Sequence, residues 1–292
     1  MSGTDAGRGP SAPGDRAVPG TAGGPTVPGG RQVPGGREIP GDRAVVAYDG
    51  DGRAVPPLLT GLLPAGVAAT ELHVGRGVHD LRRFGLLDEA DRAVVARAVA
   101  SRRAEYGDVR WCARDALARL LPGAAGPVRR GDQGMPVFPE GSVGTLSHTD
   151  GVRVAVVGDA RRWRSLGCDV EVADPLPEEV TAMVTSEGER RMLAAVRRGP
   201  SGELAPGVAA TVLFSAKESV YKAWFPLARR FLDFDGADLR LDADGRWEAR
   251  ILDAPTPVPV VAGRWDVRAT GGGDVYVVTT AAVGQGPSAD GQ

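Results

Sequence analysis

Two lysines, Lys217 and Lys222, are the residues of this 292-residue chain whose placement first suggests chemistry. Both lie in the nonapeptide FSAKESVYK at residues 214–222, whereas the other 33 basic residues are all arginine. A chain that uses arginine almost everywhere retains ammonium groups where a planar guanidinium would not serve, and a compact, flexible point charge suits a site that handles phosphate. We therefore predict that this segment contributes to a phosphate-binding site.

Two acidic residues, Asp169 and Glu171, could supply oxygen ligands from a strand expected at residues 165–173. Side chains alternate along a strand, so these two share one face, with Cα atoms roughly 6.6 Å apart, and Cys168 takes the other face. On a solvated face they would mean little. On a partly buried face their like charges require a proton or a cation, and such oxygens suit Mg²⁺, which completes its shell with water and substrate phosphate.

A helix is expected to begin near Ser215 and to carry Glu218 and both lysines. On the helix alone, two interpretations stay open. Ser215 and Glu218 match a capping box, and Glu218 with Lys222 matches an exposed ion pair worth ~0.3 to 0.5 kcal/mol. Because arginine would form that pair equally well, the retained lysines favour the alternative, a metal-plus-diphosphate site shared with the strand carboxylates and suited to phosphoryl-type transfer.

The elements that must position these residues are of mixed type. Alternating apolar residues predict strands at 68–74, 143–148 and 152–158, and Asp150-Gly151 favours a tight hairpin between the last two. A long helical region is expected from about residue 88 to 121, with an interruption at Gly107. His148 then lies at a strand end, where either an ordinary polar residue or a ligand contact would fit.

Three arginines of the long helical region, Arg103, Arg110 and Arg114, fall within about 40° of arc if the helix is continuous. Such a stripe fits either an anion site or a solvated helix face, and spacing alone does not choose between them.

Composition separates a tail from the rest of the chain. Residues 1–42 contain 12 Gly and 7 Pro and no aromatic residue, which is typical of a disordered segment. The apolar stretch near residues 56–70 is broken by Pro64 and two glycines, so neither a membrane span nor a signal peptide is expected. Cys112 and Cys168 are too few for a disulfide framework and indicate free thiols in a reducing cytoplasm.

Four segments together resemble the 4′-phosphopantetheinyl transferases of the larger, two-lobed type, which includes surfactin-synthetase-activating and enterobactin-synthetase component D-like enzymes. They are RRAEYGDVRWCARDAL at 102–117, MPVFPEGSVGTLSH at 135–148, GCDVE at 167–171 and FSAKESVYKAW at 214–224. The motif Gly-x-Asp-x-Glu alone is weak evidence for the family. Together with Phe-Ser-x-Lys-Glu-x-x-x-Lys at this separation, it is specific evidence.

The resemblance implies an α/β (α+β) pseudodimer of two similar subdomains, each with a small, mostly antiparallel sheet packed on a long helix. The implied boundaries are a disordered tail at 1–42, an N-terminal subdomain at 43–163, a C-terminal subdomain at 164–283 and a flexible C-terminus at 284–292. Coenzyme A would bind between the halves of a monomeric, cytoplasmic enzyme.

The resemblance also implies transfer of the 4′-phosphopantetheine moiety of coenzyme A to a serine of an acyl or peptidyl carrier protein, with release of 3′,5′-ADP. Siderophore, nonribosomal peptide or polyketide synthases would supply the carriers. Mg²⁺, with Mn²⁺ as an alternative, would be the metal. Its implied ligands are Asp169, Glu171 and Glu218, and Glu218 is also the implied base.

The remaining implied roles concern coenzyme A. Lys222 would stabilise charge on the diphosphate with help from Lys217, unless Lys217 only supports the helix. The other implied contacts are Ser147 and His148 at the phosphates and Arg103, Arg110 and Arg114 around the 3′-phosphate. Met135 departs from the family, because many relatives have a basic residue there, so Arg129 or Arg130 would have to replace it.

Two other functions stay open, a metal-dependent nuclease or phosphodiesterase and a non-catalytic module that binds coenzyme A or a carrier protein. The formal net charge of −2 gives no general basic field for nucleic acid, which argues against the nuclease. A binding module could do without the full set of three carboxylates and two lysines.

Overall fold

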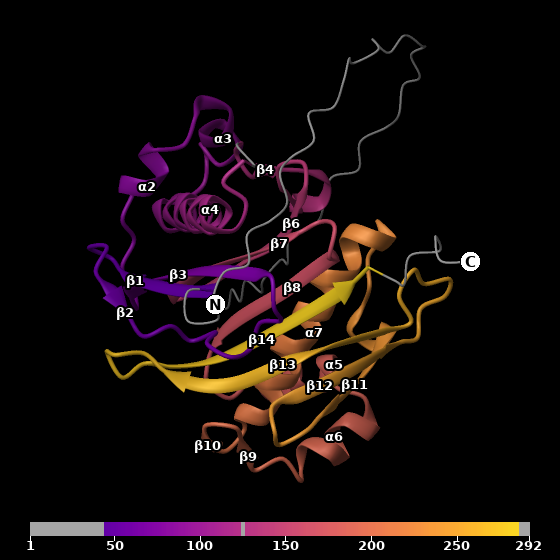
Figure 1. Cartoon of the computed structure of the whole chain (residues 1–292). Coiled ribbons are helices and arrows are strands. Elements are labelled where there is room, and N and C mark those ends of the chain that lie inside the picture. The colour runs from indigo at the N-terminus through magenta and orange to yellow at the C-terminus, as the bar shows by residue number, and fades with distance from the viewer. Residues whose placement is uncertain (1–43, 124–125, 286–292) are drawn as a thin grey trace, which may run out of the picture. The chain divides into compact units, whose positions relative to one another are not determined.

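A computed structural model of the chain describes residues 44–123 and 126–285 (Figure 1). The expected disordered tail at 1–42 lies outside these residues, as do residues 286–292 of the expected flexible C-terminus. Among the helices in the described ranges, none combines the length and the apolar character needed to cross a membrane.

The first sheet has the strand order β2-β1-β3-β7-β6. Its strands are β1 (Val45–Asp49), β2 (Ala54–Val55), β3 (Val67–Gly75), β6 (Ser142–Thr149) and β7 (Gly151–Asp159). β1 and β3 run parallel, and the other neighbours are antiparallel. The expected strands and the hairpin between β6 and β7 are confirmed, and Gly151 at φ 91° supplies the left-handed residue that the tight turn requires.

The long helix α4 (Ala100–Leu120) packs on β3 and β7 of this sheet (Figure 1). The expected interruption at Gly107 is wrong, because α4 is continuous through it. A Cβ atom at Gly107 would lie 2.4 Å from the backbone nitrogen of Phe84, so glycine is needed where the short helix α2 (Arg82–Gly85) lies against α4. The region also begins later than expected, since α3 (Glu89–Val94) is a separate helix capped by Asp88.

The second sheet has the order β11-β12-β13-β14-β8 and is antiparallel throughout. Its strands are β8 (Trp163–Val172), β11 (Ala237–Leu241), β12 (Arg246–Ile251), β13 (Val260–Ala269) and β14 (Val275–Gly284). Helix α7 (Val208–Ala228) packs on this sheet over a core that contains Trp224, Trp247 and Trp265. Two small sheets, each with one 21-residue helix, confirm the expected mixed α/β class.

Helix α7 begins at Val208 rather than near Ser215. Ser215 is therefore an interior helix residue, and its hydroxyl lies 3.0 Å from Oγ1 of Thr279 on β14. The capping-box interpretation of Ser215 and Glu218 is wrong for this reason. The apolar run at residues 208–213 extends the buried face of the helix toward its N-terminus.

The two sheets share a hydrophobic core. It joins Val154 and Val156 of β7 to Leu166 and Val170 of β8 and to Val278 of β14. The shorter elements are α5 (Glu178–Val184), α6 (Glu187–Leu193), η1 (Asp132–Gly134), η2 (Phe234–Gly236), β4 (Arg129–Arg130), β5 (Pro136–Val137), β9 (Arg198–Gly199) and β10 (Gly202–Glu203).

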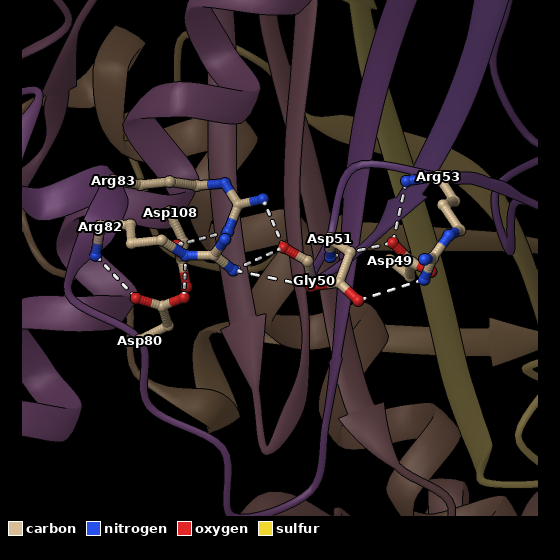
Figure 2. A network of polar contacts seen from close by, with 8 residues as sticks. All are labelled: Asp49, Gly50, Asp51, Arg53, Asp80, Arg82, Arg83 and Asp108. Carbon is tan, nitrogen blue, oxygen red and sulfur yellow. Dashed lines mark hydrogen bonds and ion pairs between the residues drawn. The ribbon is translucent and has the colours of Figure 1, made fainter.

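A polar network connects α2 to the turn after β1 and to α4 (Figure 2). Arg82 and Arg83 each donate a 3.1 Å hydrogen bond to the carbonyl of Gly50. Arg83 also lies 3.8 Å from Asp108 of α4, and its guanidinium stacks 4.9 Å from the ring centroid of Trp111. Asp108 is only 1% exposed, and this burial raises its pKa to about 6 despite the nearby charges of Arg83 and Arg153.

We expect Asp108→Asn to remove the part of the pH dependence of the free energy of unfolding that comes from titration of Asp108. The raised pKa means that folding favours the protonated carboxyl, so its contribution is fully present below about pH 4 and is lost as the pH rises through about 6. Urea unfolding should show the wild type losing about 1 to 3 kcal/mol relative to Asp108→Asn over that range. A constant difference between the two proteins would contradict the expectation.

Candidate functional site

The site depends on a close approach of α7 to β8. A Cβ atom at Gly167 would lie 2.0 Å from the carbonyl oxygen of Ser219, so a larger residue would push the helix away from the strand. The expected alternation along β8 is confirmed: Leu166, Cys168 and Val170 face the shared core, which leaves Asp169 and Glu171 on the α7 side. The glycine of the Gly-Cys-Asp-Val-Glu segment therefore brings the strand carboxylates next to Lys222.

Lys222 forms an ion pair with Asp169 at 2.6 Å. Its ammonium also donates to Oγ of Ser147 at 3.1 Å and to the carbonyl of Cys168 at 3.2 Å. Ser147, at the end of β6, donates a 2.8 Å hydrogen bond to the same Asp169 oxygen. Burial alone would lower the pKa of Lys222, but Asp169 and Glu218 outweigh it and raise that pKa, so the ammonium is charged at neutral pH.

Glu171 and Glu218 complete the acidic group. Burial, followed by the charge of Asp169, raises the pKa of Glu171 to about 7. Burial also raises the pKa of Glu218, again with Asp169 adding to the shift. Thr149, which follows His148 on β6, donates a 3.3 Å hydrogen bond from its hydroxyl to Glu171. Two carboxyl groups of raised pKa beside the carboxylate of Asp169 favour a proton or a cation at this place.

The carboxylate oxygens of Asp169, Glu171 and Glu218 are of the type that binds a hard cation, although they do not point to one common position. Across residues 44–123 and 126–285, no group of three or more His, Cys, Asp or Glu side chains is arranged to hold a metal ion. However, Oδ2 of Asp169 is buried without a hydrogen-bond partner, and Asp169 as a whole is 3% exposed. A buried, unpartnered carboxylate oxygen beside two carboxyls of raised pKa is the chemistry that Mg²⁺ would satisfy.

A pocket of about 340 Å³ opens beside this group. Glu218 and Lys222 line it from α7, together with Tyr221 and Phe225, and His148 lines it from β6. Three arginines, Arg102, Arg110 and Arg130, add positive charge to the wall. Asp169 and Glu171 are not among the lining residues, so the charged side chains of the wall are mainly basic.

His148 is held neutral at the pocket wall. Its Nε2 lies 2.7 Å from Nη1 of Arg102 and 3.0 Å from Oε2 of Glu105. Burial lowers the pKa of His148, Glu105 opposes this effect, the charges of Arg102, Arg153 and Lys222 add to it, and the resulting pKa is about 4. The imidazole can therefore act as a hydrogen-bond partner without adding charge.

The expected arginine stripe is only partly at the pocket. Arg110 lines it and stacks 3.2 Å from the ring centroid of Tyr106. Arg103 instead packs on Phe84, and Arg114 lines a second pocket, which shares only Arg110 with the first. The structure thus brings Arg110, but neither Arg103 nor Arg114, to the pocket beside Lys222.

Sequence reasoning missed Arg102, and a different spacing would have found it. The pocket face of α4 runs through Arg102, Tyr106, Val109 and Arg110, an i, i+4, i+7, i+8 pattern that spans about 100° of the helix. That pattern combines apolar and basic residues, whereas the stripe of Arg103, Arg110 and Arg114 is defined by arginines alone. Arg130, one of the two proposed replacements for the cation missing at Met135, lines the pocket beside Met135.

Lys217 points away from the pocket. It is 5% exposed and pairs with Glu189 of α6 at 2.9 Å, and it also donates to the carbonyl of Phe234 at 2.8 Å. Glu189 further accepts from the backbone nitrogens of Ser186 and Leu239. The structure therefore supports the interpretation in which Lys217 stabilises the helix rather than assisting Lys222.

Comparison with known proteins agrees with this geometry. The model of the 4′-phosphopantetheinyl transferase N-terminal domain matches residues 90–158, and the model of the 4′-phosphopantetheinyl transferase superfamily matches residues 165–281. The chain belongs to this superfamily. The second match begins within β8, the strand that carries Asp169 and Glu171.

Three curated transferases are similar over most of their length. The 4′-phosphopantetheinyl transferase Svp of Streptomyces mobaraensis is 48% identical over 184 residues, which cover 61% of this chain and 70% of Svp. PptT of Mycobacterium tuberculosis is 41% identical over 60% of this chain and 78% of its own length. Npt of Nocardia iowensis is 34% identical over 70% of this chain and 92% of its own length.

We expect Arg102→Ala to weaken coenzyme A binding by roughly 10-fold, since an arginine bond to phosphate contributes about 1.5 to 3 kcal/mol. Arg114→Ala, on the same helix but at the second pocket, should change the affinity by less than about 2-fold. Isothermal titration with coenzyme A measures both. A larger loss of affinity in Arg114→Ala than in Arg102→Ala would support the predicted stripe of Arg103, Arg110 and Arg114 instead.

We expect Lys217→Met to act on stability rather than on ligand binding. It leaves the charge of Glu189 buried without its partner, which should lower the free energy of unfolding by about 3 to 5 kcal/mol. Lys217→Met combined with Glu189→Gln should recover part of that loss, and the folded protein should keep its affinity for coenzyme A. A Lys217→Met protein with wild-type stability but reduced affinity for coenzyme A would indicate that Lys217 contributes to the binding site.

Proposed function

We propose that the chain transfers the 4′-phosphopantetheine moiety of coenzyme A to a serine of an acyl or peptidyl carrier protein and releases 3′,5′-ADP. The observation that carries the proposal is the contact of Lys222 with both Asp169 and Ser147 at the edge of a pocket lined by three arginines. Membership of the superfamily supports the reaction class.

The arginines bind the anionic groups of coenzyme A. Arg102, Arg110 and Arg130 offer planar guanidiniums that can pair with phosphate oxygens, and His148 offers a hydrogen bond close to Lys222. Ser147 is buried outside the pocket wall and acts on the site through its bonds to Lys222 and Asp169. Because His148 is neutral, it leaves the charge balance of the pocket to the arginines and to Lys222. The diphosphate is thereby held with its β-phosphorus toward Glu218.

The transfer itself is a displacement at phosphorus. The carrier serine oxygen forms a bond to the β-phosphorus while the bond from that phosphorus to the bridging oxygen breaks, and the electron pair leaves with 3′,5′-ADP. Glu218, whose pKa is raised by burial, accepts the serine proton. Lys222 neutralises the charge that develops on the departing phosphate. The ion pair with Asp169 keeps the Lys222 ammonium charged and holds it in place.

Asp169, Glu171 and Glu218 would hold Mg²⁺, or Mn²⁺ in its place. When bound, the ion supplies charge neutralisation and alignment of the diphosphate oxygens. The unpartnered Oδ2 of Asp169 and the raised pKa values of the two glutamates support this assignment.

The remaining features of the proposal concern context. The carriers are those of siderophore, nonribosomal peptide or polyketide synthases, and the enzyme acts in the cytoplasm as a monomer on coenzyme A rather than on nucleic acid. Residues 43–163 and 164–283 form its two subdomains, and the shared core between the sheets supports docking of one on the other.

The experiment that tests the proposal incubates the full-length chain with coenzyme A, Mg²⁺ and an apo carrier protein, and then weighs the carrier by mass spectrometry. We expect the carrier to gain one phosphopantetheine, with 3′,5′-ADP released in equal amount, and a carrier whose serine is replaced by alanine to gain nothing. Folded protein that modifies none of several carriers would overturn the proposal.

Two variants, Asp169→Ala and Glu218→Gln, test the roles of individual residues in the same assay. Each should lower the transfer rate by at least roughly 100-fold, because each removes a charge from the reacting region. Circular dichroism should show the wild-type helix content in both. Wild-type turnover in either variant would remove that residue from its role.

A further inference from the structure

A fully buried arginine lies behind the candidate site. Arg153 on β7 is 0% exposed and is paired in register with His148 across the hairpin. Its Nη1 donates to the carbonyl of Thr149 and, at 3.1 Å, to the carbonyl of Val152. Both acceptors close the hairpin turn at residues 149–152, which directly follows His148, and Arg153 is not among the residues that line the pocket. The guanidinium therefore acts on the turn rather than on a ligand.

Asp108 of α4 faces the other side of this guanidinium. Nε of Arg153 lies 3.8 Å from Oδ2 of Asp108, and Nη1 of Arg83 lies 3.8 Å from Oδ1. Figure 2 shows the outer part of this arrangement, in which Arg83 also reaches Gly50. Nε of Arg153 and Oδ1 of Asp108 are buried without hydrogen-bond partners, so charge rather than hydrogen bonding fixes Arg153 against α4.

Thr149 connects the turn to the acidic group. Arg153 binds its carbonyl, and its hydroxyl donates to Oε2 of Glu171 at 3.3 Å. A continuous series of contacts thus runs from Asp108 through Arg153 and Thr149 to Glu171. It leads from the helix of the first sheet to a carboxylate of the second.

We propose that Arg153 is a positioning residue: anchored by Asp108, it fixes the backbone of Thr149 so that the threonine hydroxyl orients the carboxylate of Glu171 toward a divalent cation. The inference rests on the proposed function, which gives Glu171 a cation to hold. Groups that orient metal ligands from behind change metal affinity by about 10- to 100-fold when they are removed.

A role in stability alone accounts less well for this arrangement. Burying a guanidinium and a carboxylate without good hydrogen bonds between them stabilises a fold little, and apolar residues of similar volume often serve better. The hydrogen bonds that Arg153 does make all go to the backbone of one turn. That turn is the one whose side chains reach the site.

The test measures the affinity for Mg²⁺ rather than the rate of transfer. Mg²⁺ is titrated calorimetrically into the full-length chain saturated with coenzyme A, for the wild type, Thr149→Val, the double variant Arg153→Met/Asp108→Asn, and the triple variant. The double variant removes both buried charges together, so that neither is left unpaired. Affinity for coenzyme A without Mg²⁺ is the control and should change by less than about 2-fold, because none of the three residues lines the pocket.

We expect Thr149→Val and the double variant each to raise the Mg²⁺ concentration at half-saturation by roughly 10-fold. The triple variant should bind no more weakly than the weaker of these two, because the changes act on the same carboxylate. An unchanged half-saturation in the double variant, or additive effects in the triple variant, would assign Arg153 to stability alone. If the double variant does not fold, Thr149→Val decides by itself: a wild-type Mg²⁺ affinity overturns the proposal.

The outcomes separate this proposal from the proposed function. A wild type that binds Mg²⁺ but modifies no carrier overturns the transferase reaction, while the titration still decides on Arg153. A wild type that modifies carriers, with variants that keep its Mg²⁺ affinity, overturns only the role of Arg153. A wild type that binds no Mg²⁺ beside coenzyme A overturns the positioning role together with the metal assignment.

Discussion

The ion pair between Lys222 and Asp169 is the interaction on which the rest of the structure around the pocket depends. It joins α7 to β8, and through Ser147 it reaches β6 of the other sheet. Asp169 is buried, so removing Lys222 would leave its charge uncompensated, at a cost of about 3 to 5 kcal/mol. Gly167 is the steric condition for the pair, because only a residue without a Cβ lets the helix come this close.

Local patterns predicted much of this arrangement. Alternation placed Asp169 and Glu171 on one face of β8, and the hairpin signal at Asp150-Gly151 placed His148 at the end of β6. The two lysines drew attention to α7, which does place Lys222 at the pocket wall. These signals are readable because they depend on neighbours within a few positions of the chain.

Features that depend on distant partners could not be read in this way. Lys217 and Lys222 are five positions apart and look equivalent in sequence. In the structure, however, Lys217 forms an ion pair with Glu189, which lies 28 positions away. Gly107 reads as a helix breaker, but it is required by the backbone of α2 against α4. The choice of Arg102 over Arg103 follows from which side of α4 meets β6, and helical spacing among arginines does not contain that information.

Ser147 and Asp169 meet across the boundary between the two superfamily matches, at residues 90–158 and 165–281. The second match contains all three carboxylates and Lys222, whereas the first contributes Ser147 and His148, so the arrangement is complete only where the two sheets meet. A substitution that shifts β6 would move Ser147 relative to Asp169 although it changes no residue of the second match. The seam between the sheets is therefore a place where a change in one half alters the geometry of the other.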